Sequence, residues 1–271
     1  IRKVLKKLNV DLYTYVVDNN EIDDIFRAFF NAGVPEIDAA TDLALAEVLY
    51  RAAAEYGVKY ILEGHSFLTE GVSPLGNIYV DGKYINSVHK QFGTVPMKTY
   101  PLMDFTAFIK WILFKRIKKI RPFWYMDYCK EEARAFLEKE FGWQYYGGHH
   151  LENRMTAFNH SYWLPNKFGV DLRNLTLSAA ARRGALSREE ALRRYAEPVH
   201  MEDELVEYLK KRLKLTDEQF DATMRGPNKS ARDYPTYKRR FEKLRPFFFV
   251  MAKLNLVPMS FYIKYTSKSG V

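Results

Sequence analysis

Strand-like and helical patterns alternate over the first 65 residues, and this alternation constrains the fold more than any other feature of the chain. The run DLYTYVV at 11–17 is rich in β-branched and aromatic residues and has the length of a strand. Apolar residues at helical spacing predict a helix over 22–30, stopped by Gly33, and a second helix over 41–56. VKYILEGHS at 58–66 then indicates a short buried strand that enters a turn. Strands separated by helices predict a parallel α/β sheet.

The helix at 41–56 carries a single apolar stripe, which we expect to face the core. Thr41 or Asp38 can cap its start, and Gly57 ends it. The stripe consists of Leu45, Val48, Leu49, Ala52, Ala53 and Tyr56.

The alternation continues to about residue 147. Residues 71–100 are rich in glycine, proline and asparagine, which indicates a hairpin around Asp81-Gly82 or an ordered insertion. We therefore predict an α/β domain at 1–147. Its remaining segments are a helix, a strand, a helix and a strand, at 103–118, 120–126, 130–140 and 143–147.

Beyond residue 147 the apolar spacing is helical, and no convincing strand intervenes. This pattern predicts a helical, substrate-binding C-terminal region at 148–271. Its helices are expected at 173–183, 187–195, 202–214, 216–224 and 234–254.

Charge and cysteine content limit the partners and the compartment. Lys and Arg number 42 against 33 Asp and Glu, and the formal charge of +9 favours anionic partners. The basic runs FKRIKKIR and YKRRFEKLR are scattered, so solvated helix faces explain them better than one binding patch. The single cysteine, Cys129, excludes an internal disulfide and suits a reducing, cytoplasmic location. The apolar run at 105–114 is too short to span a membrane and contains Lys110.

The turn EGHSFLTEG at 63–71 follows a predicted strand, where parallel sheets bind ligands. Gly64 permits close approach of a ligand to the backbone, while His65, Ser66 and Glu70 offer a ring nitrogen, a hydroxyl and a carboxylate. A strand-terminating turn without a ligand explains the same residues equally well.

A second candidate, YYGGHHLENRMTAF, is a glycine turn leading into a helix. His149, His150, Glu152 and Arg154 surround the predicted helix start. Adjacent histidines point in different directions and no further zinc ligand lies at the usual spacing, so we expect no metal here. Ring nitrogens, a guanidinium and free helix amides suit an anion or a sugar instead.

The next stretch, NHSYWLPNKFGVDLR, contains Tyr162, Lys167 and Arg173. Its cations can hold a diphosphate, whereas its aromatic residues are better explained as core. Cys129 lacks the neighbours of a catalytic thiol, and neither G-x-x-x-x-G-K-[ST] nor G-x-G-x-x-G occurs. The residues alone therefore name no catalytic group.

Two stretches, at 41–71 and 142–192, resemble the N-acetyl sugar amidotransferases of bacterial lipopolysaccharide and surface-polysaccharide synthesis. The resemblance covers most of residues 1–198 and is most specific in GWQYYGGHH, YWLP and LSREEAL. It implies a parallel-sheet ATP pyrophosphatase (PP-loop) domain of the adenine nucleotide alpha hydrolase-like type, followed by a helical part. The pyrophosphate loop of that superfamily, S-G-G-x-D-S, is absent from the 271 residues, and we expect it upstream of Ile1.

The resemblance implies conversion of the acetamido group of a nucleotide-linked N-acetyl sugar to an acetamidino group. ATP with Mg2+ would adenylate the amide oxygen, and ammonia from a partner glutaminase would then displace AMP. No nucleic acid partner is expected from it.

Matching positions give the implied site residues. Gly64, His65, Ser66 and Glu70 are assigned near the nucleotide, with Asp42 on the preceding helix. The sugar nucleotide is assigned to His149, His150, Glu152, Arg154, Tyr162, Lys167 and Arg173.

Two alternatives remain open at this point. The charge of +9 and the basic tail also suit a PP-loop enzyme that modifies tRNA. A non-enzymatic protein that binds an anionic polymer or a membrane surface through FKRIKKIR and YKRRFEKLR is the other.

Overall fold

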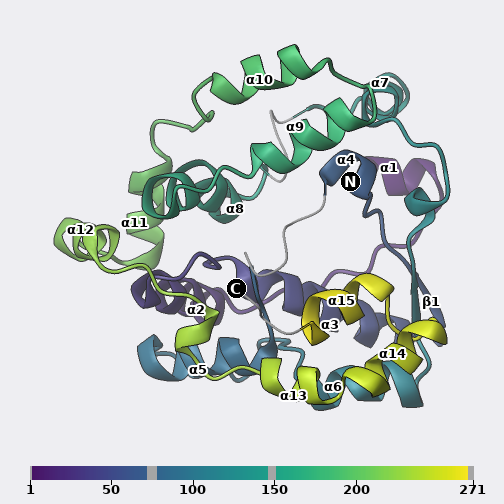
Figure 1. Cartoon of the computed structure of the whole chain (residues 1–271), viewed down its shortest axis with the longest axis horizontal. Helices are drawn as coiled ribbons and strands as arrows, with labels where there is room; N and C mark the ends of the chain where they lie inside the picture. The colour runs from purple at the N-terminus through teal and green to yellow at the C-terminus, as the bar shows by residue number, and fades with distance from the viewer. Residues whose placement is uncertain (1, 72–77, 146–150, 268–271) are drawn as a thin grey trace.

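Two short parallel strands form the sheet of the described part of the chain, which comprises residues 2–71, 78–145 and 151–267 of a computed structural model (Figure 1). Strand β1 (Tyr60–Leu62) pairs with β2 (Lys118–Ile120), with Ile61 opposite Lys119. The strand expected at 58–66 forms and pairs in parallel, but its partner β2 precedes the strand expected at 120–126 and shares only Ile120 with it, since residues 122–124 form a 3-10 turn. The chain is thus a mostly helical α/β protein with a very small sheet.

The other expected strands are wrong where the structure describes them. Residues 11–17 have no regular secondary structure and are largely exposed, with Val16 84% exposed. Residues 143–145 are also irregular, and 146–147 lie outside the described residues. β-propensity needs a neighbouring strand to become a strand, and neither segment has one among the described residues. The expectation that β1 is buried is also wrong, because only Ile61 is buried and Leu62 is 70% exposed.

Helix α2 (Asn19–Ala32) is the centre of the larger hydrophobic core. Its start is capped by Asp18, whose side chain accepts a hydrogen bond from the Asn20 N–H, and it ends at Gly33 with a φ of 67°. The apolar positions expected from its spacing are all buried, which confirms this helix and its buried face: Ile22, Ile25, Phe26, Phe29 and Phe30. The core around them includes residues of α5 (Gly82–Phe92), α8 (Arg154–Phe158), η3 (Asn159–Phe168), α11 (Leu205–Leu213) and α12 (Asp217–Arg225).

Helix α5 replaces the hairpin expected around Asp81-Gly82. The Asp81 side chain accepts a hydrogen bond from the Tyr84 N–H at 2.7 Å, so the Asp-Gly pair begins a helix rather than a two-residue turn. The insertion alternative cannot be followed over 72–77, which lie outside the described residues.

Helix α3 (Ala39–Glu55) forms as predicted but buries a different face. Leu45, Leu49 and Tyr56 of the expected stripe are 58%, 44% and 67% exposed. Glu47 is buried instead, because its carboxylate accepts a hydrogen bond from Trp111 Nε1 at 2.8 Å and pairs with Arg51. An acid that has satisfied partners can take a core position that hydrophobicity alone assigns to leucine.

The last helices return to the first half of the chain (Figure 1, yellow beside purple and blue). The predicted helix at 234–254 is instead divided into α13 (Lys238–Lys243) and α14 (Arg245–Lys253), because Pro246 in the first turn of α14 starts a new helix. They are followed by α15 (Met259–Thr266), which the sequence did not reveal. Helices α14 and α15 share a second core with α3, α6 (Phe105–Ile109) and the π-helical turn η1 (Lys110–Phe114).

Both hydrophobic cores combine residues from each side of the 147/148 boundary. The remaining described elements are α1 (Arg2–Lys7), α4 (Phe67–Glu70), η2 (Pro122–Trp124), α7 (Lys130–Phe141), α9 (Arg173–Arg182), α10 (Arg188–Ala196) and η4 (Ala231–Asp233).

Candidate functional site

The carboxyl ends of β1 and β2 meet at one edge of the sheet because the strands are parallel. The chain leaves β1 through Glu63, Gly64 and His65 and leaves β2 through Arg121 and the turn η2. The rings of His65 and Trp124 lie 6.5 Å apart between centroids. The strand ends thus bring together side chains from segments that are far apart in the sequence.

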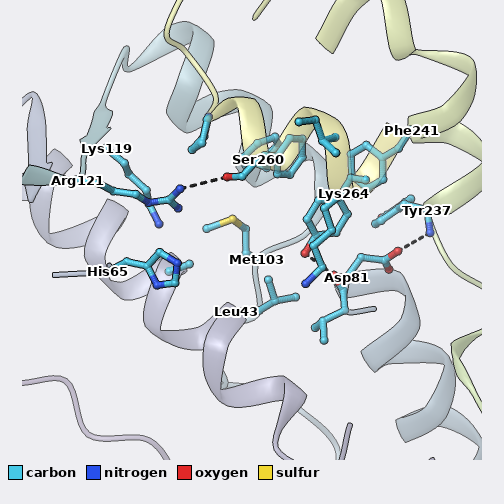
Figure 2. Close-up of a pocket in the computed structure, with 18 of the residues that line it drawn as sticks. Leu43, His65, Asp81, Met103, Lys119, Arg121, Tyr237, Phe241, Ser260 and Lys264 are labelled. Carbon is cyan, nitrogen blue, oxygen red and sulfur yellow. Dashed lines mark hydrogen bonds between the residues drawn. The ribbon is translucent and has the colours of Figure 1, made fainter. Parts of the chain in front are cut away.

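A cavity of about 750 Å³ opens at this edge (Figure 2). Its walls come from the strand ends and from α3, α4, α5, α6, α9, α13 and α15. Lys119 and Arg121 line one side, Asp81 and Lys264 line the other, and Met103 lies between them. A cavity of this size can enclose most of a nucleotide-sized ligand.

His65 and Glu70 of the predicted nucleotide-binding turn both line the cavity. His65 Nδ1 lies 2.6 Å from a Glu70 carboxylate oxygen, across the start of the short helix α4. Ser66 is buried behind them, and its hydroxyl has no hydrogen-bond partner among the described residues. A Cβ at Gly64 would meet only Phe123, at an ordinary 3.8 Å, so this position does not require glycine for space.

Two cations share one carboxylate at the cavity wall. Lys119 Nζ and Arg121 Nε donate to the two oxygens of Glu63 at 2.6 Å and 2.9 Å. Burial raises the pKa of Glu63, but the attraction of Lys119 and Arg121 outweighs it and holds the pKa below the usual range. Because the carboxylate stays ionised, this group of three carries a net positive charge.

Helix α15 brings Lys264 to the opposite wall. Burial lowers the pKa of its amine, while the charges of Asp42 and Glu36 oppose that shift. Asp42, predicted near the nucleotide, is therefore coupled to the cavity through Lys264, although it does not line the cavity itself.

The second predicted stretch lies at the start of α8, and none of its described residues lines the cavity. Arg154 donates to Glu202 at 2.9 Å and stacks over Tyr208 at 4.2 Å. Asn153 caps the helix by accepting from the N–H groups of Met155 and Thr156. The amides expected to be free for an anion are therefore occupied by a side chain. His149 and His150 lie outside the described residues, and Glu152 is described there with a partner of its own.

The third stretch is core rather than loop. Trp163 is fully buried and donates to the Val34 carbonyl at 3.0 Å, and Tyr162 stacks on Phe158. Lys167 is 8% exposed, and its amine donates to three carbonyls that follow or end α12: Thr223, Met224 and Gly226. Arg173 forms a bidentate pair with Asp171. In this conformation both cations donate to protein acceptors and stabilise helix ends and turns, and their assignment to a diphosphate stays a prediction.

Replacing Lys167 by methionine is expected to lower the free energy of unfolding by about 1.5 kcal/mol, because three carbonyls lose a charged donor. The dissociation constant for nucleotide or sugar nucleotide should stay unchanged. Urea unfolding and calorimetric titration measure the two effects, with Lys211→Met on the exposed side of α11 as the control. Weaker binding in a fully stable Lys167→Met protein would restore the diphosphate role.

The sequence did not predict several residues that line the cavity. Lys119 and Arg121 belong to FKRIKKIR, which was interpreted as a solvated face, yet their side chains are only 16% and 20% exposed. The available signal was position, since Arg121 follows β2 as Glu63 follows β1. Ser260, Lys264 and Tyr237 carried no such signal, because the return of α13 and α15 to the sheet is a long-range contact.

The described residues contain no group of three His, Cys, Asp or Glu side chains that could hold a metal ion. Cys129 is partly exposed, and its thiol lies 3.3 Å from a Glu131 oxygen. Among the helices that the structure describes, none is long and apolar enough to cross a membrane.

Comparison with known proteins relates part of the chain to a protein family. Residues 152–245 match a family model described as LPS biosynthesis protein WbpG-like, C-terminal domain. No curated protein and no solved structure matches the chain. The matched range includes α8 to α13 but neither the strand ends nor α15. The match supports a relation to proteins of lipopolysaccharide biosynthesis.

Proposed function

We propose that this chain acts in an ATP-dependent amidotransferase of lipopolysaccharide biosynthesis. The reaction converts the acetamido group of a nucleotide-linked N-acetyl sugar to an acetamidino group, and a partner glutaminase supplies the ammonia. The observation that carries the proposal is the match of residues 152–245 to the lipopolysaccharide biosynthesis family. The amidotransferase chemistry comes from the resemblance of the stretches at 41–71 and 142–192.

The cavity supports the proposal because its contents suit a nucleotide. Lys119, Arg121 and Lys264 supply positive charge for phosphate oxygens. Trp124 and Phe105 supply flat apolar surface for a base. The location beyond the carboxyl ends of parallel strands is where open α/β sheets bind nucleotides.

The described residues contain no group of three His, Cys, Asp or Glu side chains that could hold Mg2+ by themselves. Mg2+ usually needs only one or two carboxylates when nucleotide phosphates supply the other oxygens. In the proposal the ion therefore enters with ATP, and Glu70, which lines the cavity beside His65, is a candidate for a contact.

Adenylation provides the chemical logic of the reaction. The oxygen of an amide is a poor leaving group, and transfer of AMP to it makes it a good one. Ammonia then attacks the activated carbon, and AMP leaves with the former amide oxygen. A bound nucleotide next to a bound sugar supplies most of the advantage by orienting the reacting atoms. The cations of the cavity would stabilise the charge that develops on the departing phosphates.

A turnover assay tests the proposal. The full-length protein is incubated with ATP, Mg2+, an ammonium salt and a set of UDP-linked N-acetyl sugars. We expect AMP and pyrophosphate, and a sugar product lighter by the difference between an oxygen and an NH group, detected by mass spectrometry. Reactions without ammonium should give no lighter product. Absence of AMP with every sugar would contradict the proposal, and salt-dependent tRNA binding in its place would favour the tRNA-modifying alternative.

A further inference from the structure

We infer that Arg121, Ser260 and Lys264 form a phosphate-binding site in the cavity, half of which is supplied by helix α15. Helix α15 lies outside the range that matches the lipopolysaccharide family, and none of these three residues was assigned a role by the sequence. The inference rests on the proposed function only for the choice of nucleotides as ligands.

Arg121 is held in one orientation at the cavity wall. Its Nη1 donates to Ser260 Oγ at 3.2 Å (Figure 2). Its Nε donates to Glu63 at 2.9 Å, and its guanidinium lies over the Trp124 ring at 4.8 Å. Among the described residues its Nη2 has no hydrogen-bond partner. A planar cation fixed in this way can offer two parallel N–H groups to a phosphate with little loss of conformational freedom.

Ser260 and Lys264 lie one turn apart on α15, so both can face the cavity. The Lys264 amine lies 5.8 Å from the centre of the Tyr265 ring, but neither a hydrogen bond nor an ion pair joins it to another described residue. Its long-range attraction to Asp42 offsets part of the cost of burying the charge. An amine that lines a cavity without a close partner is suited to an anionic ligand.

Among the described residues, the acids that line the cavity form no ion pair with Arg121 or Lys264, because their oxygens accept from other donors. Asp81 accepts from the Tyr84 and Tyr237 N–H groups, both at 2.7 Å. Asp104 accepts from the Ala107 N–H at 2.7 Å, and Glu70 pairs with His65. The described cavity therefore keeps unused donors on Arg121 and Lys264, while its acids serve the helix starts and the loop.

Helix α15 is fixed well enough to present such a site. The Lys238 amine donates to the carbonyl of Ser267 at 2.7 Å and to that of Tyr265 at 3.2 Å, beyond and within the last turn of α15. The Tyr265 hydroxyl donates to the Val80 carbonyl at 3.1 Å. Phe261 stacks on Phe108 with 5.0 Å between ring centroids. These contacts connect α15 to α13, to α6 and to the segment before α5, and they hold Ser260 and Lys264 at the cavity wall.

Calorimetric titration of the full-length protein tests the site with three probes: ATP with Mg2+, UDP-N-acetylglucosamine and inorganic pyrophosphate. Lys264→Met is expected to weaken binding of at least one probe about tenfold or more, because a charged donor to phosphate is lost. Lys264→Arg should remain within about threefold of wild type because it keeps the charge. Lys253→Met on the exposed side of α14 is the matched control and should change nothing.

The pattern over the probes identifies the source of the phosphate. Loss confined to ATP and pyrophosphate places ATP at the site, and loss confined to UDP-N-acetylglucosamine places the sugar nucleotide there. Wild-type protein that binds none of the probes, or a Lys264→Met protein that binds all of them within about twofold of wild type, would overturn the inference.

The turnover assay separates this inference from the proposed function. Binding that depends on Lys264 but gives no AMP would contradict the amidotransferase and leave the phosphate site standing. Normal turnover and binding by Lys264→Met protein would remove the site and leave the amidotransferase standing.

Discussion

Replacing Asp24 by asparagine is expected to lower the free energy of unfolding by about 3 kcal/mol at pH 7. The buried Asp24 carboxylate accepts hydrogen bonds from the N–H groups of Thr94 and Val95 at 2.8 Å and 2.9 Å, pairs with Arg27 and lies 3.0 Å from His89 Nε2. It therefore ties α2 to the loop that follows α5. An asparagine side chain loses the charge and turns an NH2 group toward donors, which leaves buried groups without acceptors.

The same carboxylate makes the protein sensitive to acid. Burial raises the pKa of Asp24, but hydrogen bonds from Val95 and Thr94 and the charge of Arg27 outweigh it and lower the pKa from 3.8 to about 2. Because the folded pKa is depressed, this stabilisation is complete above pH 3.8 and is lost as pH falls toward 2. The loss amounts to about 2 kcal/mol, so the difference between wild type and Asp24→Asn should shrink over this interval.

Urea unfolding at a series of pH values measures both effects. Asp23→Asn is the matched control, since Asp23 lies beside Asp24 on α2 but only pairs with Arg212 in a partly exposed ion pair. We expect that control to cost less than about 1 kcal/mol. Equal losses in the two variants would show that the tie between α2 and the 94–95 loop is not stabilising.

Glu36→Gln is expected to have the opposite effect, raising stability by about 2 kcal/mol or more above pH 8. Glu36 is buried beside the Tyr79 N–H at 3.2 Å and the Tyr84 hydroxyl at 3.1 Å. Burial raises its pKa from 4.5 to about 7, and the two hydrogen bonds only partly oppose that shift. A neutral glutamine can keep both contacts without the cost of a buried charge, because its oxygen can accept from the Tyr79 N–H while its NH2 donates to the Tyr84 hydroxyl.

The pH dependence of the stability of the wild-type protein tests whether burial raises the pKa of Glu36. Between pH 4.5 and about 7 the folded state keeps the Glu36 proton and the unfolded state has lost it. Stability from this group is therefore complete below pH 4.5 and falls by about 3 kcal/mol as pH rises to 7, with no further change above that. Glu36→Gln should remove this slope, whereas Glu55→Gln on the exposed end of α3 should keep it. An unchanged slope in Glu36→Gln would contradict the burial of a protonated carboxyl.

Local patterns predicted the elements that depend on local interactions. The buried face of α2 followed from the spacing of Ile25, Phe29 and their neighbours, and the end of that helix followed from Gly33. The turn with His65 and Glu70 was correctly expected after a parallel strand, and it does line a cavity. Here the residues next to each other in sequence decide the structure.

Sequence patterns did not show the contacts that some side chains make with residues far away in the sequence. Glu47 takes a core position on α3 because Trp111 donates to it from another helix. The Lys167 amine donates to three carbonyls at the end of α12, a contact that the sequence did not show, and its assignment to a diphosphate stays a prediction. The far wall of the cavity comes from α15, and tertiary packing of this helix brings Lys264 to the cavity. In each case the partner lies far away in the sequence, so the contact could not be predicted from local patterns.

Transfer of the acetamido oxygen to AMP is the central step of the proposed function, and isotope tracing tests it most directly. The full-length protein is given ATP, Mg2+, ammonium and a UDP-linked N-acetyl sugar labelled with ¹⁸O in its acetamido group. We predict that the label leaves the sugar and is recovered in the phosphate of AMP, detected by mass spectrometry. Label that stays in the sugar, or that is recovered in inorganic phosphate or pyrophosphate, would contradict adenylation of the amide and with it the proposed reaction.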